Sequence, residues 1–300
     1  MLTFGGTTNW GVLKTEGFGG PPVRRKDPGR SRDYGELIGL NLYGGRDLIA
    51  DLWVTSDGTS VQDSQAQLAN IMVNTGTTDA PLWFQLPTYP ILCSNCRPTD
   101  HPMAWDSDYG NAGVAKPTLH FHADDPRFYG QTLQTSITLG ASATGGLKFP
   151  VTFGSASPNY PYGGTLTFGA VTPATGMCNN TGNLPVNPIV VFTGPVTTPV
   201  ISNTSIAGSP SLTFVRPSQS SYTVLAGDQF VVDLDMHTQL YYSGGVSAGN
   251  PSSVNWLNYA ANPIWWSLPA LTNSSIGFVS SDWTATGATA AIQFAPAYSI

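Results

Sequence analysis

Charged side chains are scarce in this sequence. Asp, Glu, Lys and Arg make up 10% of the 300 residues, whereas an average soluble protein has roughly 25%. Disorder does not follow, because disordered chains combine high charge with little apolar content and hydrophobic residues here reach 41%. A surface with so few charges favours a protein whose faces are covered in an assembly. The formal net charge of -6 gives no reason to expect nucleic-acid binding by the chain as a whole.

Several targeting and cross-linking signals are also missing. Three cysteines do not make a disulfide framework, which favours a reducing cytosol. Met1 is followed by LTFGGTTNWG, which lacks the basic start and apolar core of a secretion signal. Without such a signal, the glycosylation patterns at Asn203 and Asn273 are discounted. No apolar run approaches the ~20 residues that a membrane span needs, so we expect no membrane contact.

Catalytic signatures are absent as well. The sequence contains no nucleophile elbow, P-loop, dinucleotide fingerprint or metalloprotease motif. Its four histidines are few for an acid/base enzyme of this length, and none adjoins a Ser or Cys nucleophile. We therefore predict that the chain is not an enzyme and carries no cofactor.

Short segments that alternate apolar and polar residues recur along the chain, separated by Gly, Pro and Asn. This pattern predicts a mostly β protein built from sandwiches or barrels. Clear examples are 48–54, 118–122, 165–168, 189–192, 211–214, 229–234 and 290–294.

One helix of about 13 residues is predicted in the N-terminal half. Ser60 to Asp63 resembles a capping box, and Gly76 suits a left-handed stop. Apolar residues then fall on one face at helical spacing, namely Val61, Leu68, Ile71 and Met72. We expect this helix to pack across a sheet.

Cys93 and Cys96 form a C-x-x-C pair, with His101 beyond it, and His120 and His122 lie two apart on a predicted strand. Together these residues could supply zinc ligands. The second cysteine pair of a zinc ribbon is missing, because Cys178 lies far away. We therefore favour packing cysteines and solvent-facing histidines.

Two other clusters have a possible chemical role. Asp233 and Asp235 place two carboxylates on one predicted strand face, which could support glycoside hydrolysis, although a strand end with hydrogen-bonded aspartates explains them more simply. Trp265 and Trp266 point to opposite faces if extended, so one of them could offer a platform for a sugar. The alternative interpretation is that both tryptophans pack in the core.

The stretch FHADDPRFYG, 121–130, gathers one histidine, two aspartates and one arginine. Proline disfavours helix at Asp125, and Asp124 and Asp125 can hydrogen-bond backbone amides in a turn. Arg127 can pair with one of them. We predict a strand that runs into an Asx-Pro turn, without catalysis.

The chain resembles the distal tail proteins, also called minor tail proteins, of long non-contractile-tailed bacteriophages, especially those of actinobacterial hosts. In the N-terminal half, the resemblance is carried by Gly45-Arg46 before LIADLWV, by 81–87 (PLWFQLP), by 96–98 (CRP) and by 123–129 (ADDPRFY). In the second half it is carried by 179–195 (NNTGNLPVNPIVVFTGP) and by 266–269 (WSLP). Leu271 stands where the family has glycine.

The resemblance implies a tail-tube-like N-terminal sheet or barrel with one helix at 1–145, a Gly/Pro-rich connector at 146–178 and a galectin-like β-sandwich at 179–300. It also implies a virion protein made in the bacterial cytoplasm. Its copies would form a hexameric ring at the distal end of the tail, joining the tail tube to the tip hub and to receptor-binding parts, with DNA only passing through the lumen. A carbohydrate-binding module at the tail tip is the alternative.

The cations of this chain are unevenly distributed. Five lie close together, namely Arg24, Arg25, Lys26, Arg30 and Arg32. This basic run can be a solvated loop, or it can contact an acidic neighbouring subunit or passing DNA. We predict that residues 5–35 form an extended arm that is ordered only against a neighbouring subunit.

Overall fold

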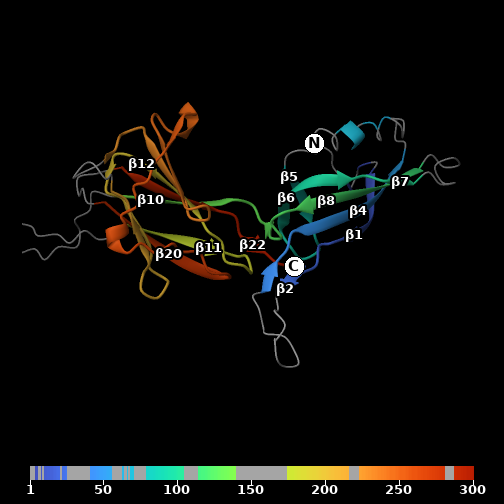
Figure 1. Cartoon of the computed structure of the whole chain (residues 1–300), viewed down its shortest axis with the longest axis horizontal. Coiled ribbons are helices and arrows are strands. Elements are labelled where there is room, and N and C mark those ends of the chain that lie inside the picture. Colours follow the sequence, from blue (N-terminus) through green and yellow to red (C-terminus); the bar gives the residue numbers. More distant parts are fainter. Residues whose placement is uncertain are drawn as a thin grey trace, which may run out of the picture. The chain divides into compact units, whose positions relative to one another are not determined.

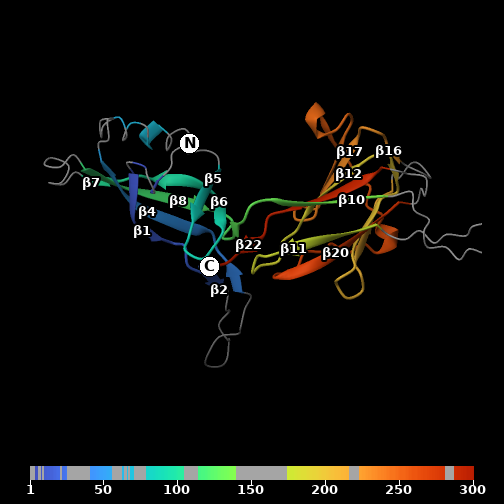
Figure 2. The same ribbon diagram turned by 180° about the vertical axis from the view of Figure 1, so that it is seen from behind.

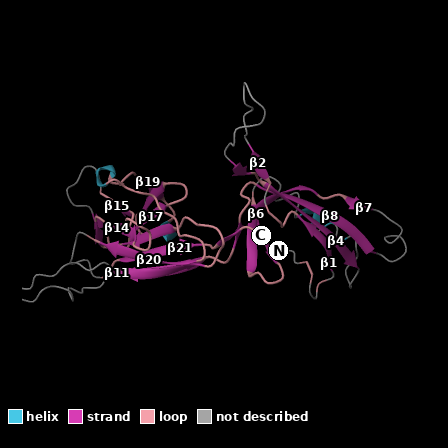
Figure 3. Cartoon of the chain, turned by 90° about the horizontal axis from the view of Figure 1, so that it is seen from below, coloured by secondary structure: helices cyan, strands magenta, loops and turns pink. Residues whose placement is uncertain are grey.

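The computed structural model describes residues 4–5, 8, 10–20, 22–25, 41–55, 63, 66, 68–70, 79–104, 114–139, 174–215, 223–280 and 287–300. The chain forms two compact units, one made of 1–131 with 297–300 and one of 132–296. Strands dominate both units (Figure 3). No helix among the described residues is long and apolar enough to cross a membrane.

The first unit is built on an antiparallel sheet in the strand order β1-β4-β8-β6-β9-β22, with β5 paired to β6 and β7 paired to β8 (Figure 1). A separate hairpin joins β2 (Val23–Arg25) to β3 (Asn41–Tyr43). The strands of the sheet are β1 (Trp10–Glu16), β4 (Arg46–Thr55), β5 (Ala80–Gln85), β6 (Ile91–Asp100), β7 (Met103–Ala104), β8 (Val114–Ala123), β9 (Phe128–Tyr129) and β22 (Ala297–Tyr298).

One face of this sheet forms the core of the first unit. Successive side chains of a strand point to opposite faces, and in β4 the inward positions Leu48, Leu52 and Val54 are at most 1% exposed. The predicted helix covers part of this face. Asp63, Ala66 and 68–70 are helical, and Leu68 packs against Leu52 and Val54 in the core. The helix is therefore confirmed, although its predicted ends lie outside the described residues.

A buried arginine ties the segment after β1 to the centre of the sheet. Arg46 is 1% exposed, its guanidinium lies 4.0 Å from the centroid of the Phe128 ring, and its Nη1 donates to the Gly17 carbonyl at 3.2 Å. Burial lowers the pKa of Arg46. Gly17 has φ +81°, and a Cβ there would lie 1.9 Å from the Asp47 carbonyl oxygen. Only glycine fits this contact, which brings Phe18 against Phe128 with 6.0 Å between ring centroids.

The second unit packs two antiparallel sheets face to face (Figure 2). The six-stranded sheet has the order β10-β21-β12-β17-β18-β19 and the four-stranded sheet the order β11-β20-β14-β15. A pair β13-β16 and two short 3₁₀ helices, η1 (Val246–Ala248) and η2 (Tyr259–Ala261), complete the described elements. The strands are β10 (Leu133–Thr138), β11 (Ala174–Asn180), β12 (Ile189–Thr193), β13 (Val196–Thr197), β14 (Val200–Asn203), β15 (Ser211–Thr213), β16 (Thr223–Val224), β17 (Gln229–Asp233), β18 (Thr238–Tyr242), β19 (Pro251–Ser253), β20 (Thr272–Val279) and β21 (Thr289–Phe294).

Aromatic rings join the two sheets of this sandwich. Phe192 of β12 lies 5.5 Å from Phe278 of β20 and 5.8 Å from Phe230 of β17, between ring centroids. Trp256 extends the cluster, with its ring 4.8 Å from that of Phe230. Such contacts stabilise a core beyond the area that they bury.

The structure confirms the mostly β prediction and corrects the predicted boundaries. The first unit ends at Gln131, and not at 145, because β10 pairs with β21 of the sandwich. Residues 140–173, which include most of the predicted connector, lie outside the described residues, but β11 begins at Ala174 within its predicted range. Residues 297–300 belong to the first unit, and not to the sandwich, since β22 pairs with β9.

The arm predicted at 5–35 is wrong in its first part. Residues 10–16 form β1 and pair with β4 of the same chain, and Phe18 packs in the core of the same unit. Residues 23–25 pair with β3. Residues 26–35 lie outside the described residues, so the prediction stands only for that segment.

Replacing Asn180 with Ala should destabilise the second unit by about 2 to 4 kcal/mol. The Asn180 side chain is fully buried, donates to the carbonyls of Leu184, Leu268 and Pro269 at 3.0 to 3.2 Å, and accepts from the Gly182 amide at 3.0 Å. Urea unfolding of Asn180→Ala measures the loss. Asn179→Ala, at the exposed neighbouring position of β11, is the control and should change stability by less than about 0.5 kcal/mol. Equal effects of the two variants would contradict the role given to Asn180.

Candidate functional site

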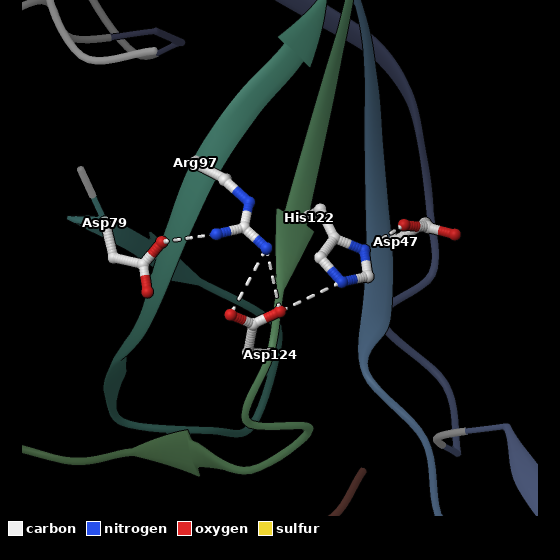
Figure 4. Close-up of polar contacts among 5 residues, drawn as sticks. All are labelled: Asp47, Asp79, Arg97, His122 and Asp124. Carbon is white, nitrogen blue, oxygen red and sulfur yellow. Dashed lines mark hydrogen bonds and ion pairs between the residues drawn. The ribbon is translucent and has the colours of Figure 1, made fainter. Parts of the chain in front are cut away.

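Polar side chains form a continuous row across neighbouring strands, at the start of β4, the end of β8, within β6 and just before β5 (Figure 4). The His122 ring lies between two carboxylates, with Nδ1 2.6 Å from Asp47 and Nε2 3.2 Å from Asp124. Arg97 Nη2 donates to Asp124 at 3.0 Å, and Arg97 Nη1 lies 3.9 Å from Asp79. We call these five residues the charged row.

The charged row holds strand ends together at the surface. In cross-strand register His122 is the partner of both Asp47 and Arg97, so the three side chains share one sheet face. The Asp47 and Asp124 side chains are 79% and 61% exposed, and ion pairs at such positions contribute about 1 kcal/mol or less. The row therefore supplies surface charge and strand register.

The turn predicted after β8 is confirmed. Asp125 accepts from the Arg127 backbone amide at 3.0 Å, from Arg127 Nε at 3.0 Å, and from the Tyr129 hydroxyl. Burial alone would raise the pKa of Asp125, but the hydrogen bonds from Arg127 and Tyr129 together outweigh it and hold that pKa below its ordinary 3.8. Asp125 is thus an ionised turn anchor that joins β8 to β9.

The five candidate zinc ligands are not brought together. Cys93 and Cys96 are buried in β6, and burial raises the pKa of Cys96 to about 12, whereas a metal binds the thiolate. His120 and His122 lie on the same face of β8, as predicted, and His101 lies beyond the end of β6. Within the described part of the chain, no three His, Cys, Asp or Glu side chains are placed to share one metal ion.

The paired aspartates of the second unit stabilise a turn. Asp233 ends β17, and its Oδ1 accepts from the amides of Asp235 at 2.8 Å and Met236 at 3.0 Å. Asp235 lies in the turn and accepts from Asn187 Nδ2 at 2.7 Å. The prediction that both carboxylates lie on one strand is wrong, but the prediction of hydrogen-bonded aspartates at a strand end is confirmed.

The two candidate sugar-platform residues have different surroundings. Trp266 is 4% exposed and is a core residue, so the platform prediction is wrong for it. Trp265 is half-buried and stacks on His237, with 4.3 Å between ring centroids and 19° between planes. Only Trp265 remains as a candidate platform.

Arg24 and Arg25 of the basic run lie in β2, while Lys26, Arg30 and Arg32 fall outside the described residues. The sequence interpretation missed Asp47 and Asp79 as partners of the charged row. Their signal is the register of β4 against β8 and of β5 against β6, which becomes visible only once the strands are paired.

No protein-family model matches this chain, and no curated protein matches it either. Among solved structures, the chain is similar to the Dit protein (gp 19.1) of phage SPP1, described as a paradigm of the hub adsorption apparatus in phages that infect Gram-positive bacteria. The TM-score is 0.58, with 16% identity over 95% of this chain and 94% of that one. A chain of the phage p2 baseplate in its activated conformation with Sr aligns at a TM-score of 0.47, with 10% identity over 96% of this chain and 91% of that one. At 16% identity the likeness to the SPP1 Dit protein shows a shared fold.

Replacing Asp125 with Asn should lower the free energy of unfolding by about 1 kcal/mol at neutral pH, after allowance for partial exposure. The folded-state pKa of Asp125 is depressed, so its stabilisation is present above the unfolded value and is lost as the pH falls through the folded value. The difference from wild type should therefore shrink between about pH 4 and pH 2. Urea unfolding across this range measures it.

Asp124→Asn is the matched control, because the ion pairs of Asp124 with Arg97 and His122 are exposed. It should cost less than Asp125→Asn at neutral pH. Two results would contradict this account of the turn. One is a larger loss of stability for Asp124→Asn than for Asp125→Asn. The other is a loss of stability for Asp125→Asn that does not depend on pH.

Proposed function

We propose that this chain is a structural virion protein of the distal end of a phage tail. The observation that carries the proposal is a fold match over both units in one alignment, covering 95% of the chain, to a phage hub protein. The family motifs agree with it. The ADDPRFY segment is a turn anchored by Asp125, and the buried Asn180 of the second motif joins the end of β11 to the Leu268 carbonyl within the sandwich. These residues maintain shape, as expected of a scaffold.

The copies of the chain form a ring, in this proposal a hexamer. Identical subunits in a cyclic ring use heterologous, head-to-tail contacts, and lasting contacts favour apolar faces. Large apolar side chains are exposed on the first unit, among them Leu13 at 58%, Ile91 at 56% and Trp83 at 48%. Such exposure on a chain of low charge supports burial in an assembly.

The ring joins the tail tube to the tip hub and gives a platform for receptor-binding proteins, while DNA passes through its lumen. In this proposal the N-terminal unit is tail-tube-like and forms the ring, and the second unit is a galectin-like sandwich. Neither unit uses a catalytic residue in this role.

Electron microscopy of the purified full-length protein tests the ring. We expect closed particles with cyclic symmetry, six-fold in the averaged top views, and a matching mass in native mass spectrometry. A monodisperse monomer at every concentration examined would contradict the proposal, as would an isologous dimer as the end state.

Deleting residues 26–40, with a short glycine turn in their place, should prevent ring closure while both units stay folded. The deletion keeps β2, β3 and the Phe18 contacts, so the stability of the first unit should be close to that of wild type. Thermal unfolding checks the fold and light scattering checks the assembly. Rings formed by the deletion variant would refute the arm prediction without refuting the ring.

The carbohydrate-binding alternative now rests on Trp265 and its stacked partner His237. A glycan array with the full-length protein tests it, with Trp265→Ala as the comparison. Binding that is lost in Trp265→Ala would favour a receptor-binding role for the second unit, and the absence of binding would remove this alternative.

A further inference from the structure

An apolar patch lies at the end of the first unit's sheet, on the face away from the core. Trp83 of β5 is 48% exposed and Ile91 of β6 is 56% exposed. In the register of the two strands Trp83 lies opposite Cys93 and Gln85 opposite Ile91, so Trp83 and Ile91 are diagonal neighbours on one face. The opposite face of β5 carries Leu82 and Phe84, which pack in the core. The patch is therefore held on a rigid strand pair.

The same sheet face is acidic beyond the patch. It includes the charged row, and strand register adds residues of β1, β4, β6 and β8. Its carboxylates are Glu16, Asp47, Asp51, Asp79, Asp100 and Asp124, and its Lys and Arg residues are Lys14, Arg97 and Lys116. With histidines neutral, these six carboxylates and three cations give a formal charge of -3. We call the apolar patch together with this acidic surface the outer face.

The β2-β3 hairpin has the complementary properties. Val23 and Tyr43 are cross-strand partners, and they are 47% and 65% exposed. The two strands of the hairpin carry two cations, Arg24 and Arg25, and no carboxylate, a formal charge of +2. The hairpin pairs with no other described strand, and a two-stranded ribbon alone is marginally stable in water. It therefore needs a surface to pack against.

The hairpin and the apolar patch do not cover each other within one chain. All four apolar side chains are at least 47% exposed. In Figures 1 and 2, β2 and β5 lie on opposite sides of the first unit. A head-to-tail contact between copies would bring the two surfaces together, with apolar groups on apolar groups and a positive segment on a negative face.

We propose that the β2-β3 hairpin of one copy docks on the outer face of the next copy, with Val23 and Tyr43 packed against Trp83 and Ile91. This inference rests on the proposed head-to-tail ring and assigns its two contact surfaces. The charge complementarity adds steering and register to the apolar contact, so added salt weakens the association. The other end of the sheet is less suited to such a contact, because β1 has a register shift between Val12 and Lys14 and a Lys14–Glu16 ion pair at its edge.

Two substitutions, one on each surface, test the contact in the full-length protein. Trp83→Glu alters the outer face and leaves the hairpin intact, and Tyr43→Glu does the reverse. Each should weaken self-association roughly tenfold or more in sedimentation experiments. Ile91→Glu repeats the first change on the neighbouring strand. Tyr259→Glu is the matched control, an exposed aromatic side chain of the second unit that belongs to neither surface, and should associate as wild type does.

Mixing the two variants distinguishes a specific docking from general damage. A mixture of Trp83→Glu and Tyr43→Glu chains retains one intact contact, the hairpin of the former on the outer face of the latter. It should form 1:1 dimers with an affinity roughly tenfold or more above either variant alone, and no larger species. Thermal unfolding of each variant confirms that it folds.

If folded Trp83→Glu and Tyr43→Glu chains form rings like wild type, or if their mixture forms no dimer, the docking surfaces are wrong and the ring still stands. If the wild-type chain remains a monomer, the proposed ring fails, and this inference fails with it.

Discussion

The first unit depends on one buried cation. Arg46 is almost fully enclosed, and the Gly17 carbonyl and the Phe128 ring stabilise it there. Among the described residues its Nε and Nη2 have no hydrogen-bond partner, so the guanidinium is costly to bury. Its role is to fix the relative positions of three segments, because it connects the segment after β1, the start of β4 and the short strand β9. The surrounding rings, Phe18 and Phe84, pack on the same side, and β5 is supported from behind by this cluster. This packing also holds the exposed Trp83 in place on the opposite face of β5.

The sequence predicted the elements of this fold better than their limits. Alternation in LIADLWV, TLHFH and QFVVDL is a local property, and these segments are strands. The helix followed from equally local signals, namely a capping box, a glycine stop and apolar residues at helical spacing. The boundary between the units could not be predicted from local signals, because it depends on the distant strands with which β10 and β22 pair. Glycine- and proline-rich composition marked residues near the boundary without identifying the pairing, and the arm was misplaced because β1 is held by long-range contacts with β4.

The candidate sites show the same division. The Asp125 turn could be derived because all its partners lie within four residues. The charged row could not, since Asp47 and His122 are 75 residues apart. Trp265 and Trp266 are adjacent in the sequence, and the choice of which one is buried was settled by the packing of the sandwich. Local chemistry was thus readable from the sequence, whereas exposure and long-range pairing required the fold.

The return of the chain to its starting unit has a consequence for biosynthesis. Strand β22 and the buried ring of Tyr298 are translated after every strand of the sandwich. A ribosome releases the N-terminal segments first. The cluster around Phe128 therefore lacks Tyr298 while about half of the polypeptide is still being made. Completion of the first unit is therefore a late event, and a copy whose synthesis stops before residue 297 lacks strand β22 of its sheet.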